Sequence, residues 1–302
     1  MGEPGQSIEA KDEAMVSVII PTYGRFPDVV RAVESVRHQT YRNFEILIVD
    51  DSNKETFQKM VTTFSDDSRV KILGGDHKGD AAARMKGIAR SRGKYVTFLD
   101  SDDEWKPNKL ERHIEIFENN PATGLSWDTC VYSDSEGQRE IRPPRQLLRH
   151  GTAFKPPILF HALLKSRENF IHMSSGFTYR RILLGLEFFP YVDPFDYVTW
   201  ILISERFEAI YIPEVMTIKH GDGPRLGKDR NHLHKENLAF SHFRLLVASR
   251  YFGNLAGVVA RSSAMYLLER LRDRFGIDAA LLDRMQSPFS WVKERILLGE
   301  RV

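Results

Sequence analysis

The chain has 302 residues, enough for one large domain or two smaller ones with a full hydrophobic core. Its formal net charge of +2 argues against a dedicated nucleic-acid binder, because such proteins carry a strong positive balance. The single cysteine, Cys130, excludes an intramolecular disulfide and a cysteine-based zinc site. Residues 1–14 are polar, which predicts a disordered leader, and no stretch reaches the roughly 18 apolar residues of a membrane span. We therefore expect a cytoplasmic protein, with peripheral contact at the inner face of a membrane as the alternative.

From residue 15 to about 131 the pattern alternates between short apolar runs and longer segments with helical periodicity. The sequence predicts strands at 16–20, 44–49, 70–73 and 94–99, and helices at 27–39, 54–64, 80–91 and 106–119. Pro21 is expected to stop the first strand, and Gly93 to close the third helix at its C′ position. Strand–helix alternation with short connections indicates an α/β fold with a doubly wound, mostly parallel sheet.

The second half of the chain is less regular. Residues 134–157 combine basic side chains with four prolines, which predicts a solvated loop or a mobile flap beside an anionic ligand. A helix is expected after Asp196, followed by strands at 209–212 and 215–219. From about residue 231 the pattern is helical throughout, so residues 229–302 are predicted to form a helical C-terminal appendage.

Clustered carboxylates follow two of the predicted strands. Asp50 and Asp51 come directly after the second strand, and Asp100-Ser101-Asp102 follows the fourth. Ligands of open α/β sheets bind at the carboxyl ends of the strands. Carboxylate oxygens suit Mg²⁺ or Mn²⁺, and such a cation can bridge a diphosphate. The sequence therefore predicts a cation and diphosphate site at this edge of the sheet.

Several segments in this order and spacing resemble the family 2 glycosyltransferases of the GT-A fold: 16–23, 35–41, 48–52 and 93–103. The resemblance covers residues 15–135 well and 170–220 loosely. It implies a catalytic domain at 15–228, with a nucleotide-sugar-binding half at 15–131 and an acceptor-side half at 132–228. It also implies an inverting enzyme that uses Mg²⁺ or Mn²⁺ to move a sugar from a nucleotide-diphospho-sugar to a glycan or lipid-linked acceptor hydroxyl, with a UDP-sugar as the expected donor. No nucleic-acid partner is expected.

The resemblance also implies roles for the donor-binding residues. Pro21, Thr22 and Tyr23 would line the nucleotide base, with the flat ring of Tyr23 against a uracil-like base. Asp51 would accept a hydrogen bond from a base N–H group. Arg84 lies in the helix that faces the nucleotide in similar enzymes, although Met85 follows it where the family usually has Asn.

Within the carboxylate cluster, the resemblance makes Asp102 the direct metal ligand. Asp100, with Ser101 beside it, would contact the ribose or the donor sugar, and Asp103 would hold a water or orient the turn. The ordinary alternative is that strand-end aspartates cap the following helix. His220, at the end of the last predicted strand, would complete the metal or diphosphate site or be structural.

An inverting transfer also needs a general base for the acceptor hydroxyl. The resemblance implies Asp196, at the start of an apolar helix, with Asp193 as the rival. N-capping by either residue is the alternative. Two other functions stay open: a catalytically inactive nucleotide-sugar-binding subunit and a sugar-phosphate nucleotidyltransferase. The C-terminal helices are expected to pack on the catalytic domain, on a second subunit or against an anionic membrane.

Overall fold

The computed structural model describes residues 15–75, 78–135, 137–165, 169–186 and 195–220. The strands are β1 (Val16–Thr22), β2 (Phe44–Asp50), β3 (Val70–Gly74), β4 (Tyr95–Phe98), β5 (Asp103–Trp105), β6 (Thr123–Asp134), β7 (Gly137–Ile141), β8 (Ala153–Phe154), β9 (Gly176–Tyr179) and β10 (Glu208–His220). The helices are α1 (Phe26–Arg37), α2 (Lys54–Thr63), α3 (Asp80–Arg90), α4 (Lys109–Asn119), α5 (Arg145–Leu148), α6 (Ile158–Lys165), the 3₁₀ helix η1 (Met173–Ser175), α7 (Arg180–Gly185) and α8 (Phe195–Ser204). The predicted leader and appendage, 1–14 and 229–302, lie outside the described residues.

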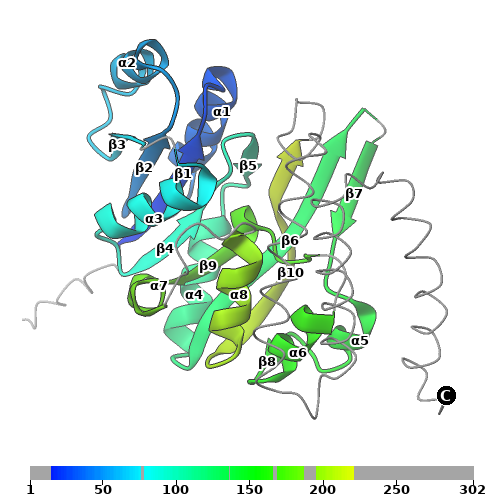
Figure 1. The fold of residues 1–302 in the computed structure, drawn as a ribbon. Coiled ribbons are helices and arrows are strands. Elements are labelled where there is room, and N and C mark those ends of the chain that lie inside the picture. The colour runs from blue at the N-terminus through cyan, green and yellow to red at the C-terminus, as the bar shows by residue number, and fades with distance from the viewer. Residues whose placement is uncertain (1–14, 76–77, 136, 166–168, 187–194, 221–302) are drawn as a thin grey trace, which may run out of the picture.

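One sheet joins all of these strands, in the order β3-β2-β1-β4-β9-β6-β10-β5, with β7 added to β6 and β8 to β10 (Figure 1). The first four strands of this order pair in parallel, and so do β6 and β10 in the longest ladder. Strands β9 and β5 run antiparallel to their neighbours. The predicted α/β fold with a mostly parallel sheet flanked by helices is therefore confirmed. Strands from both predicted halves, 15–131 and 132–228, belong to the same sheet.

The helices begin where the sequence supplies a start signal. Helix α1 has a proline in its first turn and buries a stripe at helical spacing, formed by Val29, Ala32, Val33 and Val36. Helix α2 follows Asn53, whose side chain accepts a hydrogen bond from the Thr56 N–H at 2.9 Å. These local signals explain why the predicted helix positions in the first half agree with the structure to within a few residues.

Three local predictions in the first half are wrong. Strand β1 continues through Pro21 to Thr22, because the pairing of β1 with β4 ends at Ile19 and the missing N–H of the proline removes no bond there. Helix α4 begins at Lys109 rather than at residue 106, since the Lys106 N–H donates to the Met216 carbonyl oxygen of β10 and a turn at residues 107–108 follows β5. Gly93 does not close α3, which is capped at Ser91; a Cβ at Gly93 would lie 2.7 Å from the Met15 carbonyl oxygen.

The second half is more ordered than predicted. Residues 134–157 are not a plain loop: they contain β7, α5 and β8, and β7 pairs antiparallel with β6. The two strands expected at 209–212 and 215–219 form the single strand β10, whose register with β6 shifts between Ile212 and Val215. Such a bulge lets one strand pass an irregular stretch that contains Pro213.

Helices cover both faces of the sheet. The ring of Tyr95 in β4 meets Phe117 of α4, with ring centroids 5.3 Å apart, whereas Phe98 meets Phe195 at the start of α8, 6.0 Å away. Residues three apart on a strand point to opposite faces, so α4 and α8 lie on opposite sides of the sheet, as Figure 1 shows. Of the described helices, none combines the length and the apolar character needed to cross a bilayer.

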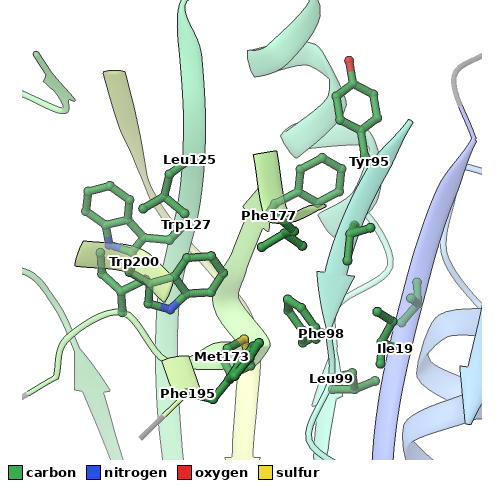
Figure 2. Close-up of a cluster of buried hydrophobic side chains, with 14 of the residues drawn as sticks. Ile19, Tyr95, Phe98, Leu99, Leu125, Trp127, Met173, Phe177, Phe195 and Trp200 are labelled. Atoms are coloured by element: carbon green, nitrogen blue, oxygen red, sulfur yellow. The ribbon is translucent and has the colours of Figure 1, made fainter. Parts of the chain in front are cut away.

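The core on the α8 side connects the two halves of the sheet. Figure 2 shows Trp127 and Trp200 beside the strands of the second half, with Met173 and Phe195 between them and Phe98 of the first half. A Cβ on Gly176 would lie 2.2 Å from the Trp200 ring, so only glycine lets β9 approach α8 this closely. This packing fixes η1, which precedes Gly176, against the carboxyl end of β4.

Candidate functional site

The candidate site lies at the carboxyl ends of β1, β2 and β4. The Asp51 N–H donates to the Thr22 carbonyl oxygen at 2.9 Å, which ties the ends of β1 and β2 together. The Thr22 hydroxyl is buried and has no hydrogen-bond partner among the described residues. The next residue, Tyr23, leaves 67% of its surface exposed. An unsatisfied buried hydroxyl beside an exposed aromatic ring is suited to a flat ligand with polar edges.

The Asp51 side chain is buried against a glycine. A Cβ on Gly75 would lie 1.5 Å from Asp51 Oδ1, and the Gly75 N–H donates to the Asp50 carbonyl oxygen at 2.7 Å. Asp50 itself accepts hydrogen bonds from the N–H and the hydroxyl of Ser52, at 3.0 and 2.7 Å. Asp50 therefore shapes its own turn, while the position of Asp51 depends on the absence of a side chain at residue 75.

Arg84 connects helix α3 to the aspartate motif. Its guanidinium is buried and donates through Nη2 to Asp100 Oδ1 at 2.9 Å and through Nε to Asp80 at 2.8 Å. Burial alone would lower the pKa of Arg84, but Asp80 and Asp100 together raise it, so the group stays charged. The third nitrogen, Nη1, is buried without a partner among the described residues. It is a charged donor still available to an anionic ligand.

Residues 100–103 form a closed turn at the end of β4. The Asp103 N–H donates to the Asp100 carbonyl oxygen at 2.9 Å. Lys219 in β10 bridges both carboxylates, with Nζ 3.1 Å from Asp100 Oδ2 and 2.6 Å from Asp103 Oδ2. Although burial raises it, the pKa of Asp100 is held well below its ordinary value by Lys219 and Arg84. Asp100 is therefore an anion with a cation on each oxygen. The next residue, Ser101, is buried within this turn.

Asp102 is the motif carboxylate that fits a divalent cation. Its side chain keeps 30% of its surface exposed and pairs with Arg25 at 2.5 Å, while Arg31 donates to its backbone oxygen at 3.0 Å. Both oxygens of Asp100 already hold cationic side chains. Within the described ranges, no three His, Cys, Asp or Glu side chains group as metal ligands. One carboxylate fits a Mg²⁺-type ion that is also bound by phosphate oxygens.

Asp196 lies in the first turn of α8. Its Oδ1 accepts from the Tyr197 N–H and its Oδ2 from Asn169 Nδ2, both at 2.7 Å. Burial raises the pKa of Asp196 to about 6, and the charges of Arg84, Asp100 and Lys219 also act on it. The pKa of this carboxyl therefore lies near neutral pH, where a general base works best. Its rival, Asp193, lies outside the described residues.

His220 and Lys219 point to different partners, as neighbours on a strand do. Lys219 contacts the two motif carboxylates, whereas His220 Nε2 lies 3.4 Å from Glu104 Oε1. This contact links His220 to β5. Its predicted role at a metal or diphosphate stays a prediction.

Sequence reasoning missed the partners that hold these side chains, namely Arg25, Asn169, Ser174, Lys219 and Gly75. Each lies far along the chain from the residue it contacts or, like Gly75, acts through a missing side chain. One signal was available in the sequence: Lys219, directly before His220, is a basic residue at the end of the last predicted strand and could pair with the strand-end carboxylates. It became informative only once β10 was placed beside β5.

Known proteins similar to this chain include several glycosyltransferases. The model of the family described as "Glycosyl transferase family 2" matches residues 17–185. The Escherichia coli protein named UDP-Glc:alpha-D-GlcNAc-diphosphoundecaprenol beta-1,3-glucosyltransferase WfgD is 31% identical over 193 residues, 64% of this chain and 70% of that protein. An uncharacterized glycosyltransferase of Rickettsia bellii is 40% identical over 108 residues, 36% of this chain. The matched segment spans only 16% of that longer protein.

Solved structures with a similar fold include two with bound nucleotide sugars. The structure of S. aureus TarS 1–349 in complex with UDP-GlcNAc superposes with a TM-score of 0.63 at 15% identity, covering 85% of this chain and 72% of that one. The mannosyltransferase PcManGT from Pyrobaculum calidifontis, in complex with GDP-Man and Mn²⁺, gives 0.55 at 19% identity, covering 91% and 80%. At these identities the likeness concerns the fold, and it is the GT-A fold that the sequence resemblance implies.

Proposed function

Because the chain belongs to glycosyl transferase family 2, we propose that it moves a sugar from a UDP-sugar to an acceptor hydroxyl with the help of Mg²⁺ or Mn²⁺. One observation carries this proposal. Asp100 and Asp102 follow β4 and Asp51 follows β2, so these three carboxylates lie at the same edge of the sheet. The charges of Arg84, Asp100 and Lys219 act on a fourth carboxyl, Asp196, whose pKa burial raises to about 6. In this proposal Asp51 binds the nucleotide of the donor, Asp102 holds the cation on the leaving diphosphate, and Asp196 deprotonates the acceptor hydroxyl.

The base of the nucleotide would lie against the exposed ring of Tyr23, with Asp51 and the buried Thr22 hydroxyl as hydrogen-bond partners for its polar edge. With the base in that position, the diphosphate of the nucleotide would extend toward the aspartate motif at residues 100–102. Nη1 of Arg84, which has no partner in the described part of the chain, would donate to an anionic oxygen, and Asp102 would hold the cation. When bound, the cation neutralises charge that develops on the departing diphosphate.

The acceptor hydroxyl would lose its proton to Asp196 as its oxygen attacks the anomeric carbon. Asn169 and the Tyr197 N–H hold this carboxylate in one orientation by a hydrogen bond to each oxygen. Attack from the side opposite the diphosphate inverts the anomeric configuration. Most of the rate would come from this positioning and from stabilisation of the leaving diphosphate.

The named relative in Escherichia coli suggests the first substrates to try. WfgD carries UDP-glucose and a GlcNAc-diphosphoundecaprenol acceptor in its name. We extend this to a UDP-sugar donor and a glycan or lipid-linked acceptor for the present chain. The predicted contact of residues 229–302 with a membrane or a second subunit belongs to the same proposal, and those residues lie outside the described part.

The test is a panel of UDP-glucose, UDP-GlcNAc, UDP-galactose and GDP-mannose, each with and without Mn²⁺. The readouts are thermal stabilisation, which reports binding, and release of nucleoside diphosphate, which reports turnover. Asp102→Asn is the matched variant and should lose Mn²⁺-dependent turnover. Binding without hydrolysis or transfer would instead favour the inactive subunit, and pyrophosphate release from a nucleoside triphosphate and a sugar 1-phosphate would favour the nucleotidyltransferase. A chain that binds no sugar nucleotide contradicts the proposal.

A further inference from the structure

The hydroxyl of Ser174 joins the two ends of the aspartate turn through a single oxygen. The Asp100 N–H donates to Ser174 Oγ at 3.0 Å, and Ser174 Oγ donates to Asp103 Oδ2 at 2.6 Å. Ser174 is fully buried. A hydroxyl has one proton and two lone pairs, so both bonds form at once. The turn that presents Asp102 is thereby clamped at its first and last residues.

The 3₁₀ helix η1 that carries Ser174 is held by donors from three other elements. The Ser174 carbonyl oxygen accepts from Trp105 Nε1 at 2.8 Å and from the Thr217 hydroxyl at 3.3 Å. The neighbouring Ser175 carbonyl oxygen accepts from Lys109 Nζ at 3.3 Å. Strands β5 and β10 and helix α4 therefore all fix the position of η1. Backbone carbonyl groups anchored in this way leave Ser174 Oγ little freedom to follow a moving turn.

Beneath η1 lies a buried charged cluster that the proposed chemistry does not use. Lys109 pairs with Asp128, and His113 contacts the same carboxylate at 3.2 Å through Nε2 and the Ser126 hydroxyl at 2.6 Å through Nδ1. All four side chains are fully or almost fully buried. A buried ion pair contributes little net stability but defines one arrangement, because any other leaves a charge unpaired. The cluster therefore fixes where Lys109 meets η1.

We propose that Ser174 is a positioning residue for the cation and diphosphate, acting through the turn at residues 100–103. This inference rests on the proposed function. Asp102, the third residue of the turn, makes its described side-chain contact only with Arg25, on a different segment. With both ends of the turn clamped, the direction of the Asp102 carboxylate is set before the ligand arrives. Outer contacts of this kind typically change metal affinity or activity by 10- to 100-fold when they are removed.

The experiment measures UDP affinity by calorimetry with and without Mn²⁺ in Ser174→Ala. We expect the gain in affinity that Mn²⁺ gives to fall roughly 10-fold, with a parallel rise in the Mn²⁺ concentration for half-maximal turnover. UDP affinity without Mn²⁺ should stay unchanged, because the proposed base contacts, Tyr23 and Asp51, belong to the loops after β1 and β2, whereas Ser174 holds the turn after β4. Ser174→Thr keeps the hydroxyl and should restore the Mn²⁺ gain. The matched control is Ser204→Ala, which removes an equally buried hydroxyl at the end of α8.

A merely structural role would lower both UDP affinities together, or neither, and either result would overturn the inference. If Ser174→Ala does not fold, Thr217→Val decides instead, since it removes one donor to the Ser174 carbonyl oxygen while keeping the side-chain volume. That variant should reduce the Mn²⁺ gain in the same direction by a smaller factor, and an unchanged gain contradicts the inference. Failure of the proposed function shows differently, as a native chain that binds no UDP with or without Mn²⁺.

Discussion

The guanidinium of Arg25 lies 2.5 Å from the Asp102 carboxylate. Arg25 is two residues after Tyr23, in the segment between β1 and α1. A cation side chain therefore holds the carboxylate proposed to bind Mg²⁺ or Mn²⁺. Both side chains are partly exposed, so the pair is screened by solvent and is worth at most about 1 kcal/mol. A divalent ion that also binds diphosphate can displace such a partner.

Arg25→Gln should lower the Mn²⁺ concentration that gives half-maximal turnover. The substitution removes the competitor for Asp102, and the gain is limited to about fivefold because the exposed pair is weak. The measurement is a Mn²⁺ titration of donor hydrolysis. Arg42→Gln is the control, since Arg42 hydrogen-bonds the Arg37 carbonyl oxygen away from the motif. A higher Mn²⁺ requirement in Arg25→Gln would show that Arg25 assists the ligand instead of competing with the cation.

Tyr23→Ala should weaken donor binding while leaving the fold intact. Stacking of a base on an aromatic side chain is worth about 1–3 kcal/mol, which predicts a rise in donor KM of roughly 5- to 150-fold. Tyr23 is highly exposed, so its loss removes little core packing. Leu184→Ala, at the other large exposed apolar residue of the described part, is the control and should leave KM unchanged. An unchanged KM in Tyr23→Ala would exclude this ring from the donor site.

Gly75→Ala should displace Asp51 and weaken donor binding. The added methyl group would overlap Asp51 Oδ1, which has to move because the glycine backbone is tied to Asp50. Gly74→Ala is a matched control in the adjacent position, where the nearest atom to a new Cβ is 3.8 Å away on Phe57. We expect the donor KM to rise only in Gly75→Ala. Equal effects of the two substitutions would indicate a general loss of loop structure.

The activity should rise with pH through a midpoint near pH 6 and reach a plateau above about pH 7. Burial raises the pKa of Asp196 to about 6, so at pH 5 only about one tenth of the molecules carry the ionised base. Asp196→Asn should lower kcat by roughly 10²- to 10⁴-fold and remove this rising limb. The readout is kcat/KM between pH 4.5 and 8. A limb that persists in the residual activity of Asp196→Asn would assign it to another group.

The same shift has an opposite consequence for stability. The pKa of Asp196 in the folded chain lies above its ordinary value, so the neutral form is favoured by folding. Its contribution to stability is present below the ordinary pKa and is lost as pH rises through about 6. The base therefore becomes active over the same pH range in which it destabilises the fold.

Lys109→Met should destabilise the protein strongly, by about 3–5 kcal/mol, because it leaves Asp128 buried without its cation. The double variant Lys109→Met/Asp128→Leu removes both charges and should recover most of that loss. Urea unfolding followed by fluorescence measures both changes. A double variant as unstable as the single one would mean that the pair itself contributes a large net stability.

Sequence reasoning located the first four strands and helices because each is defined by local periodicity and by start signals such as Asn53. It failed at β5, β8 and β9, where a strand exists only because a distant partner completes its hydrogen bonds. It also missed β7, which pairs locally with β6 within the basic, proline-rich segment 134–157. Helix α4 was started too early for the same reason: residues 103–105 pair with β10, more than a hundred positions away. Local pattern contains no information about that partner.

The sequence by itself determined the alternation of strands and helices and the carboxylates at the ends of β2 and β4, since these depend on neighbours in the chain. Only the tertiary structure decided what those carboxylates contact. Lys219, Ser174 and Arg25 reach the turn at residues 100–103 from elements far away in sequence. Hydrogen bonds and ion pairs act over a few ångströms of space, and that proximity arises only when the sheet brings β4, β5, η1 and β10 together.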